Sequence, residues 1–146
     1  MDLRDDSVAA ISGPFKVEGS LALKAPVDGE KLLAFSPYKI LWDTIGTIPK
    51  VRLEYSRDEF SQDIHVIAAE APNQGAHEWR VPDDIGPSLK VRVADASNFS
   101  VSSTSPAPFS IHGAFSFTTT TGGARWAVGS QQEISWQTVG TIPQIK

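Results

Sequence analysis

The chain has 146 residues, of which 40% are hydrophobic and 21% are charged, with a net charge of −4 and no cysteine. This composition argues against wholesale disorder. The negative net charge argues against a basic face that would bind nucleic acid. The lack of cysteine excludes disulfide bridges and thiolate metal sites. No apolar run approaches the roughly 20 residues that cross a bilayer, so this segment is not expected to insert into a membrane.

The elements predicted along the chain are short strands, because apolar and polar residues alternate with a period of two. The alternation is most regular in residues 51–56 and 89–95. Turn formers, chiefly Pro, Gly, Asn and Asp, separate the alternating runs. The predicted strands span residues 15–24, 38–43, 50–56, 62–68, 76–81, 88–95 and 100–112. Seven strands in about 95 residues are typical of an all-β fold, an immunoglobulin-like or fibronectin-III-like β-sandwich.

A core between two sheets is predicted from the apolar residues on these strands. Its expected members are Val17, Ile40, Trp42, Val51, Leu53, Tyr55, Trp79, Leu89, Val91 and Val93. Trp42 is the candidate for the centre of this core, because Trp136 occupies the same place in a second copy of the sequence.

That second copy follows with a period of 94 residues, the spacing between Trp42 and Trp136. Residues 15–52 align without a gap on residues 109–146, and 11 of the 38 pairs are identical. The longest identical run pairs residues 46–49 with residues 140–143. A repeat of this length corresponds to one small domain, so the sequence indicates tandem repeats.

The repeat predicts three parts: residues 1–12 as the tail of a preceding repeat, 13–108 as a complete repeat, and 109–146 as the truncated start of the next. The Pro-bearing stretch 102–108 is predicted to be a short, semi-rigid joint. Residues 109–146 alone would leave Ile134, Trp136 and a sheet edge uncovered. We therefore expect this part to be poorly ordered, to pack against the complete unit, or to mediate association.

Five runs of the chain, taken in order, resemble a known repeat; they cover residues 40–42, 46–48, 51–58, 79–82 and 91–98. Together they resemble the immunoglobulin-like domain of the Ser/Thr-rich, GPI-anchored surface protein family. That family includes the N-terminal domain of yeast cell-wall β-1,6-glucan assembly proteins, and similar copies occur in tandem in bacterial secreted or surface proteins. The resemblance covers the complete unit and both partial copies. It departs after Asp58, where family members often continue with glycine and tryptophan and this chain has residues 59–63 instead.

The resemblance implies a non-catalytic module of an extracellular or cell-surface protein that acts as a structural spacer or in adhesion. It implies no catalytic residue, no cofactor and no metal site. The expected partners are the neighbouring repeats of the same chain, with cell-wall or extracellular glycans and surface proteins as further candidates.

An enzyme interpretation could start from Ser56, Arg57 and Asp58, which resemble the opening of an Asp-box, the hairpin of sialidase propellers. The glycine and tryptophan of that motif are missing, and a 94-residue period is too long for a propeller blade. Asp58 is therefore interpreted as a turn residue whose carboxylate binds local backbone amides.

Metal-ligating residues are not suggested by spacing. His65, His77 and His112 lie on separate predicted strands and are interpreted as ordinary surface histidines. The pairs Asp5–Asp6 and Asp83–Asp84 lack the spacing of a calcium loop and are interpreted as solvated turn carboxylates.

Aromatic residues replace leucines in the second copy: Phe115, Phe117 and Trp126 stand where the first copy has Leu. Exposed aromatics could stack on sugars, which favours an alternative function as a carbohydrate-binding module accessory to a glycan-active enzyme. Because the replaced residues are already apolar, core or sheet-cover positions are the preferred interpretation. A third possibility, a catalytic domain, needs a cleft with convergent polar groups, for which a small sandwich leaves little room.

Overall fold

The computed structural model describes residues 12–14, 16–119, 123 and 125–143. Within these residues every regular element is a strand, and no helix of membrane-spanning length and apolarity occurs among them. The strands are β1 (Ser20–Ala25), β2 (Lys31–Leu33), β3 (Pro37–Ile45), β4 (Lys50–Ser56), β5 (His65–Pro72), β6 (Ala76–Arg80), β7 (Gly86–Asp95), β8 (Ser102–Thr104), β9 (Phe109–His112), β10 (Ala114–Phe117) and β11 (Trp136–Val139). All but residue 12 of the predicted tail 1–12 lies outside the described residues.

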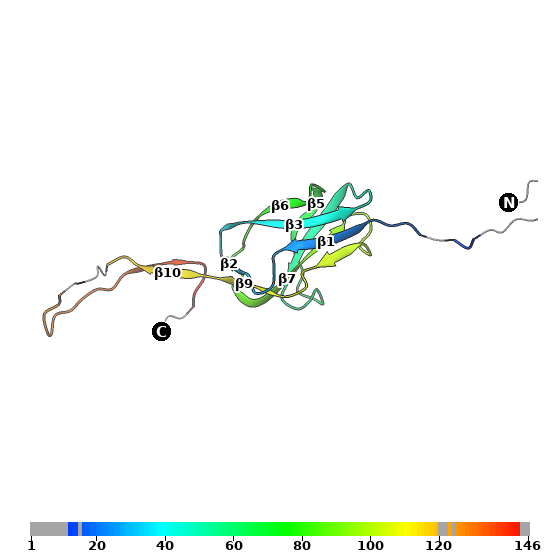
Figure 1. The fold of residues 1–146 in the computed structure, drawn as a ribbon. Helices are drawn as coiled ribbons and strands as arrows, with labels where there is room; N and C mark the ends of the chain where they lie inside the picture. The colour runs from blue at the N-terminus through cyan, green and yellow to red at the C-terminus, as the bar shows by residue number, and fades with distance from the viewer. Residues whose placement is uncertain (1–11, 15, 120–122, 124, 144–146) are drawn as a thin grey trace, which may run out of the picture.

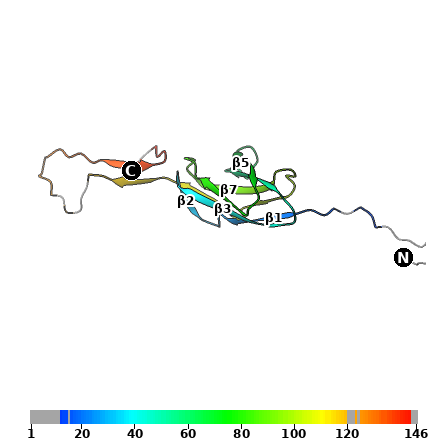
Figure 2. The same ribbon diagram turned by 90° about the horizontal axis from the view of Figure 1, so that it is seen from above.

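The first nine strands form a two-sheet sandwich, and β10 and β11 pair beyond one end of it (Figures 1 and 2). The small sheet has the order β1-β3-β6, and the large sheet has the order β2-β9-β7-β4-β5 with β8 also paired to β7. All pairs are antiparallel except β2 with β9. Because the chain passes from the small sheet to the large one after β3 and returns for β6, the topology is that of an immunoglobulin-like or fibronectin-III-like sandwich, as predicted.

The core lies between the two sheets and contains nine of the ten residues predicted for it. Trp42 is 3% exposed, and its indole Nε1 donates a hydrogen bond of 2.7 Å to Asn73 Oδ1. The prediction is wrong for Val17, which is 84% exposed. The strand predicted to begin at residue 15 begins at Ser20, so Val17 precedes the sheet.

The end of the sandwich also differs from the prediction. The predicted strand 100–112 is split into β8 and β9, and residues 102–108 are part of the sandwich rather than a joint. Ser105 shows this, because it is buried and is hydrogen-bonded to strand β7. Its amide donates to the Val91 carbonyl (2.8 Å), and its Oγ accepts from the Val91 amide (3.2 Å). The split follows from Pro106 and Pro108, which have no N–H to give to a strand ladder.

Strand β9 closes the large sheet, because it pairs with β2 on one side and with β7 on the other. Phe109 and Ile111 are each 1% exposed in the common core. A boundary after residue 108 would separate β9 from the sheet that it closes, and the sandwich ends at His112.

Two strand pairs of the structure have the same register at the 94-residue spacing. In β1–β3 the partners are Ser20–Ile45, Leu21–Thr44, Ala22–Asp43 and Leu23–Trp42; in β10–β11 they are Ala114–Val139, Phe115–Thr138, Ser116–Gln137 and Phe117–Trp136. The aligned residues of the two copies thus adopt the same local structure.

The glycine before each pair also has the same surroundings. A Cβ on Gly19 would lie 2.9 Å from the Ile45 carbonyl oxygen, and a Cβ on Gly113 would lie 2.6 Å from that of Val139. No side chain fits at either place, which explains why both copies have glycine there.

Candidate functional site

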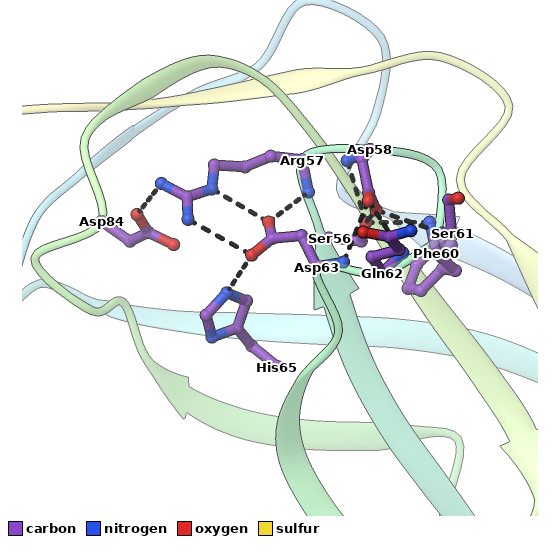
Figure 3. Close-up of polar contacts among 9 residues, drawn as sticks. All are labelled: Ser56, Arg57, Asp58, Phe60, Ser61, Gln62, Asp63, His65 and Asp84. Atoms are coloured by element: carbon purple, nitrogen blue, oxygen red, sulfur yellow. Dashed lines mark hydrogen bonds and ion pairs between the residues drawn. The ribbon is translucent and has the colours of Figure 1, made fainter.

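The turn after β4 is organised by Ser56 and Asp58 (Figure 3). The Asp58 carboxylate accepts hydrogen bonds from the backbone amides of Ser61, Gln62 and Asp63 at 3.1, 2.8 and 2.9 Å. These bonds, that of the Asp63 amide foremost, hold the pKa of Asp58 below its ordinary value. Asp58 thus binds local amides, as its interpretation as a turn residue requires.

The same turn contains residues 59 and 60, whose backbone conformation is unusual. Glu59 and Phe60 both have left-handed φ angles, 58° and 64°, without a glycine at either position. Such angles are costly for residues with a Cβ. The Phe60 ring lies 4.2 Å from the Arg92 guanidinium, and this cation–π contact offsets part of the cost.

Arg57 joins two carboxylates next to this turn (Figure 3). Its Nε lies 2.9 Å from Asp63 Oδ2 and its Nη1 lies 2.8 Å from Asp84 Oδ1, while His65 Nε2 lies 2.7 Å from Asp63 Oδ1. The hydrogen bonds of Arg57 and His65 hold the pKa of Asp63 well below its usual range. A carboxylate held ionised in this way is not set up as a general acid.

The histidines lie on three different strands, as predicted. His65 of β5 and His77 of β6 line an open groove of about 560 Å³ with Tyr55 and Trp79, and His112 ends β9 away from it. The His65 ring stacks on the Tyr55 ring at 4.7 Å between centroids. Among the described residues no three His, Asp or Glu side chains gather in an arrangement that could hold a metal ion.

Sequence reasoning missed an ion cluster on the outer face of the large sheet. Glu54 is 3% exposed; its Oε1 accepts from Arg52 Nε at 2.5 Å and its Oε2 from Arg92 Nη2 at 2.5 Å. Burial pulls the pKa of Glu54 upward, but the hydrogen bonds from Arg92 and Arg52 outweigh burial and leave the pKa lowered. The Arg52 guanidinium in turn lies 5.7 Å from the Phe99 ring. Alternate polar positions on neighbouring predicted strands were the signal that could have revealed this cluster.

The turn 140–143 of the second copy binds the loop that follows β6. Asp83 Oδ1 and Oδ2 accept from the Thr141 amide at 2.8 and 3.0 Å, and Oδ2 accepts from the Thr141 hydroxyl at 2.6 Å. These bonds, led by that of the Thr141 side chain, hold the pKa of Asp83 below its ordinary value. Asp83, an exposed residue of the loop after β6, thus binds Thr141, and the partly exposed Asp84 binds Arg57. Asp5 and Asp6 lie outside the described residues.

Gly140 allows this contact because it has no side chain. Its φ is 80°, and a Cβ there would lie 2.9 Å from Asp83 Oδ1, 3.1 Å from Ile85 Cδ1 and 3.3 Å from the Ala34 Cβ. The backbone of the second copy is therefore in close contact with the end of the sandwich, across a surface that contains both a carboxylate and apolar atoms.

The aromatic residues that follow Phe109 in the second copy are exposed rather than in a core. Phe115 and Phe117 lie edge to face with ring centroids 6.2 Å apart, and neither they, Trp126 nor Trp136 is buried. The preferred interpretation of Phe115, Phe117 and Trp126 as core or sheet-cover residues is not met in this structure, because only β11 pairs with β10 and no second sheet faces the two strands in the described part of the chain.

Comparisons with known proteins add little. No protein-family model and no curated protein matches the chain. One solved chain of the fibronectin(III)-like modules of Clostridium thermocellum CbhA is similar, with 13% identity, a TM-score of 0.40, and coverage of 82% of this chain and 62% of that chain. This chain thus spans less than two thirds of that neighbour. The assignment of the fold rests on the strand order of the two sheets and on the core that they share.

Of these places, the contact of Asp83 with Gly140 and Thr141 is the candidate functional site. It joins two parts of the chain that the sequence identifies as successive copies, through three hydrogen bonds and a close backbone approach. Its chemistry is that of packing between two segments of the chain: a carboxylate accepts from the amide and hydroxyl of a turn.

Proposed function

We propose that the chain is part of a tandem array of immunoglobulin-like repeats in a secreted or cell-surface protein, where it acts as a structural spacer or adhesion module without catalytic activity. The observation that carries the proposal is the binding of the Thr141 turn to Asp83. The equal register of β1–β3 and β10–β11 at the 94-residue spacing supports it. The ordered resemblance to the Ser/Thr-rich, GPI-anchored surface protein family supports the surface location.

The geometry suits a stiff array. Strand β9 ends the sandwich at His112 and β10 begins at Ala114, so Gly113 is the single residue between them. Together with the Asp83–Thr141 contact, this gives two points of attachment between the sandwich and the next segment. Two attachments restrict bending and rotation more than a flexible linker does. The proposed repeat then runs from residue 19 to residue 112, which is one full period.

Limited trypsin digestion tests this division. Lys16 and Arg125 are exposed outside the proposed unit, whereas Arg52 and Arg92 lie in its central strands. We expect early cleavage after Lys16 and Arg125 and a resistant fragment 17–125, identified by mass spectrometry, that keeps the unfolding midpoint of the full chain. Early cleavage within residues 19–112, or resistance that extends over the full chain, would contradict the division into units.

Carbohydrate binding is the second candidate function, and the exposed Phe115, Phe117, Trp126 and Trp136 favour it. If the chain is a spacer, it should stay in the supernatant when incubated with insoluble β-glucan, chitin or cell walls. Retention of the chain on one of these materials, if lost in Trp126→Ala, would favour the carbohydrate-binding module instead. The control is Phe99→Ala, which changes an exposed aromatic residue elsewhere and should keep the retention.

A further inference from the structure

The sandwich has a second turn of the kind that binds Asp83. Residues 46–49 have the sequence of residues 140–143, Gly46 has a φ of 84° against 80° for Gly140, and each turn follows a strand of the same register. The amide and hydroxyl of Thr47 therefore have the same local backbone setting as those of Thr141.

This second turn lies at the opposite end of the small sheet from Asp83. Strand β3 has Pro37 beside Arg80 at one end, next to the loop that holds Asp83, and Ile45 beside Ser20 at the other, next to Gly46. The nine residues of β3 separate the two ends by roughly 25–30 Å. A carboxylate acceptor and a turn that could bind such an acceptor thus lie at opposite ends of one unit.

The turn at Gly46 and Thr47 is open to a partner. Both residues are exposed, and Thr47 has no hydrogen bond with any other described residue. A Cβ on Gly46 would meet only the Gly19 backbone, at 3.1 Å, whereas a Cβ on Gly140 would meet three residues of the sandwich to which its turn is bound. No described residue therefore lies against Gly46 on the side where Asp83, Ile85 and Ala34 lie against Gly140.

Val17 gives an independent indication of what lies on that side. It corresponds to Ile111, which is 1% exposed as part of the last strand of the sandwich. Val17 itself is 84% exposed. It lies as many residues before the start of β1 as Ile111 lies before the start of β10. An apolar residue at this position is explained if residues 16–18 complete the sheet of an upstream unit.

Building on the proposed function, we propose that Gly46 and Thr47 bind the loop carboxylate of an upstream copy of the unit, so that successive units interlock head to tail through one repeated Asp–Thr contact. The upstream partner is a sandwich with an aspartate at the place of Asp83 and small or apolar residues at the places of Ala34 and Ile85. The contact makes the orientation between neighbours the same at every joint.

The test is the full chain with an additional copy of residues 19–112 inserted after His112, which places the Asp83 of the first copy beside the Gly46 and Thr47 of the second. We expect amide exchange of Thr47 to be slowed by about tenfold in the second copy relative to the first. Asp83→Ala in the first copy should remove this protection, and Asp28→Ala, which removes an exposed aspartate elsewhere, should not.

Cross-linking provides a second readout because the chain has no cysteine. Asp83→Cys in the first copy with Thr47→Cys in the second should form a disulfide on mild oxidation, and Asp28→Cys with Thr47→Cys should not. Two independently folded copies with neither protection nor cross-linking would overturn the interlock and leave the spacer function standing. An inserted copy that does not fold as a separate unit would overturn both.

Discussion

Replacement of Trp42 by alanine is expected to lower the free energy of unfolding by about 3–5 kcal/mol, the usual cost of removing a buried tryptophan. Trp42 is 3% exposed between the two sheets, and its indole N–H donates to Asn73 Oδ1. Urea denaturation followed by circular dichroism at neutral pH measures the change. A loss of this size is a large part of the stability of a small domain.

Trp136 provides the matched control, because it is the same residue at the equivalent position of the second copy. It is 48% exposed, and Trp136→Ala should change the free energy of unfolding by less than about 0.5 kcal/mol. Trp42→Phe keeps an aromatic ring and separates the loss of the hydrogen bond, about 1 kcal/mol, from the loss of packing. Equal losses at Trp42 and Trp136 would mean that both tryptophans share one interior.

Strand positions and the core could be predicted from the sequence, because alternation reports directly which residues face inward. The residues at which the sandwich begins and ends could not be predicted from the sequence. Alignment of residues 15–52 with residues 109–146 determines the period but not the residue at which a unit begins, since any starting point gives the same period. The closure of the large sheet by β9 shows where the sandwich ends, and that pairing joins residues distant in sequence.

The candidate site could not be predicted from the sequence for a similar reason. Asp83 and Thr141 are 58 residues apart, and neither has a neighbouring residue that signals the other. The identical residues 46–49 and 140–143 indicated that the turn is repeated, but not that it binds a carboxylate. In contrast, the turn role of Asp58 could be predicted because its partners are the next few amides of the chain.

Replacement of Glu54 by glutamine is expected to lower the free energy of unfolding by about 1–3 kcal/mol at pH 7, because it leaves two arginines without their counter-ion. The cost is below that of breaking a fully buried pair, since the side chains of Arg52 and Arg92 are each 26% exposed. Glu70→Gln is the matched control: it breaks an exposed pair with Lys50 and should cost less than about 0.5 kcal/mol.

The pH dependence separates the ion cluster from simple packing. The pKa of Glu54 is lowered in the folded protein. The stabilising contribution of its charge to the free energy of unfolding is therefore fully present above the pKa of the unfolded chain, about 4.3, and is lost as the pH falls through the pKa of the folded protein. The difference in unfolding free energy between wild type and Glu54→Gln should therefore be largest near neutral pH and shrink below about pH 4. A difference that stays constant from pH 7 to pH 3 would show that Glu54 stabilises the sheet by its shape and not by its charge.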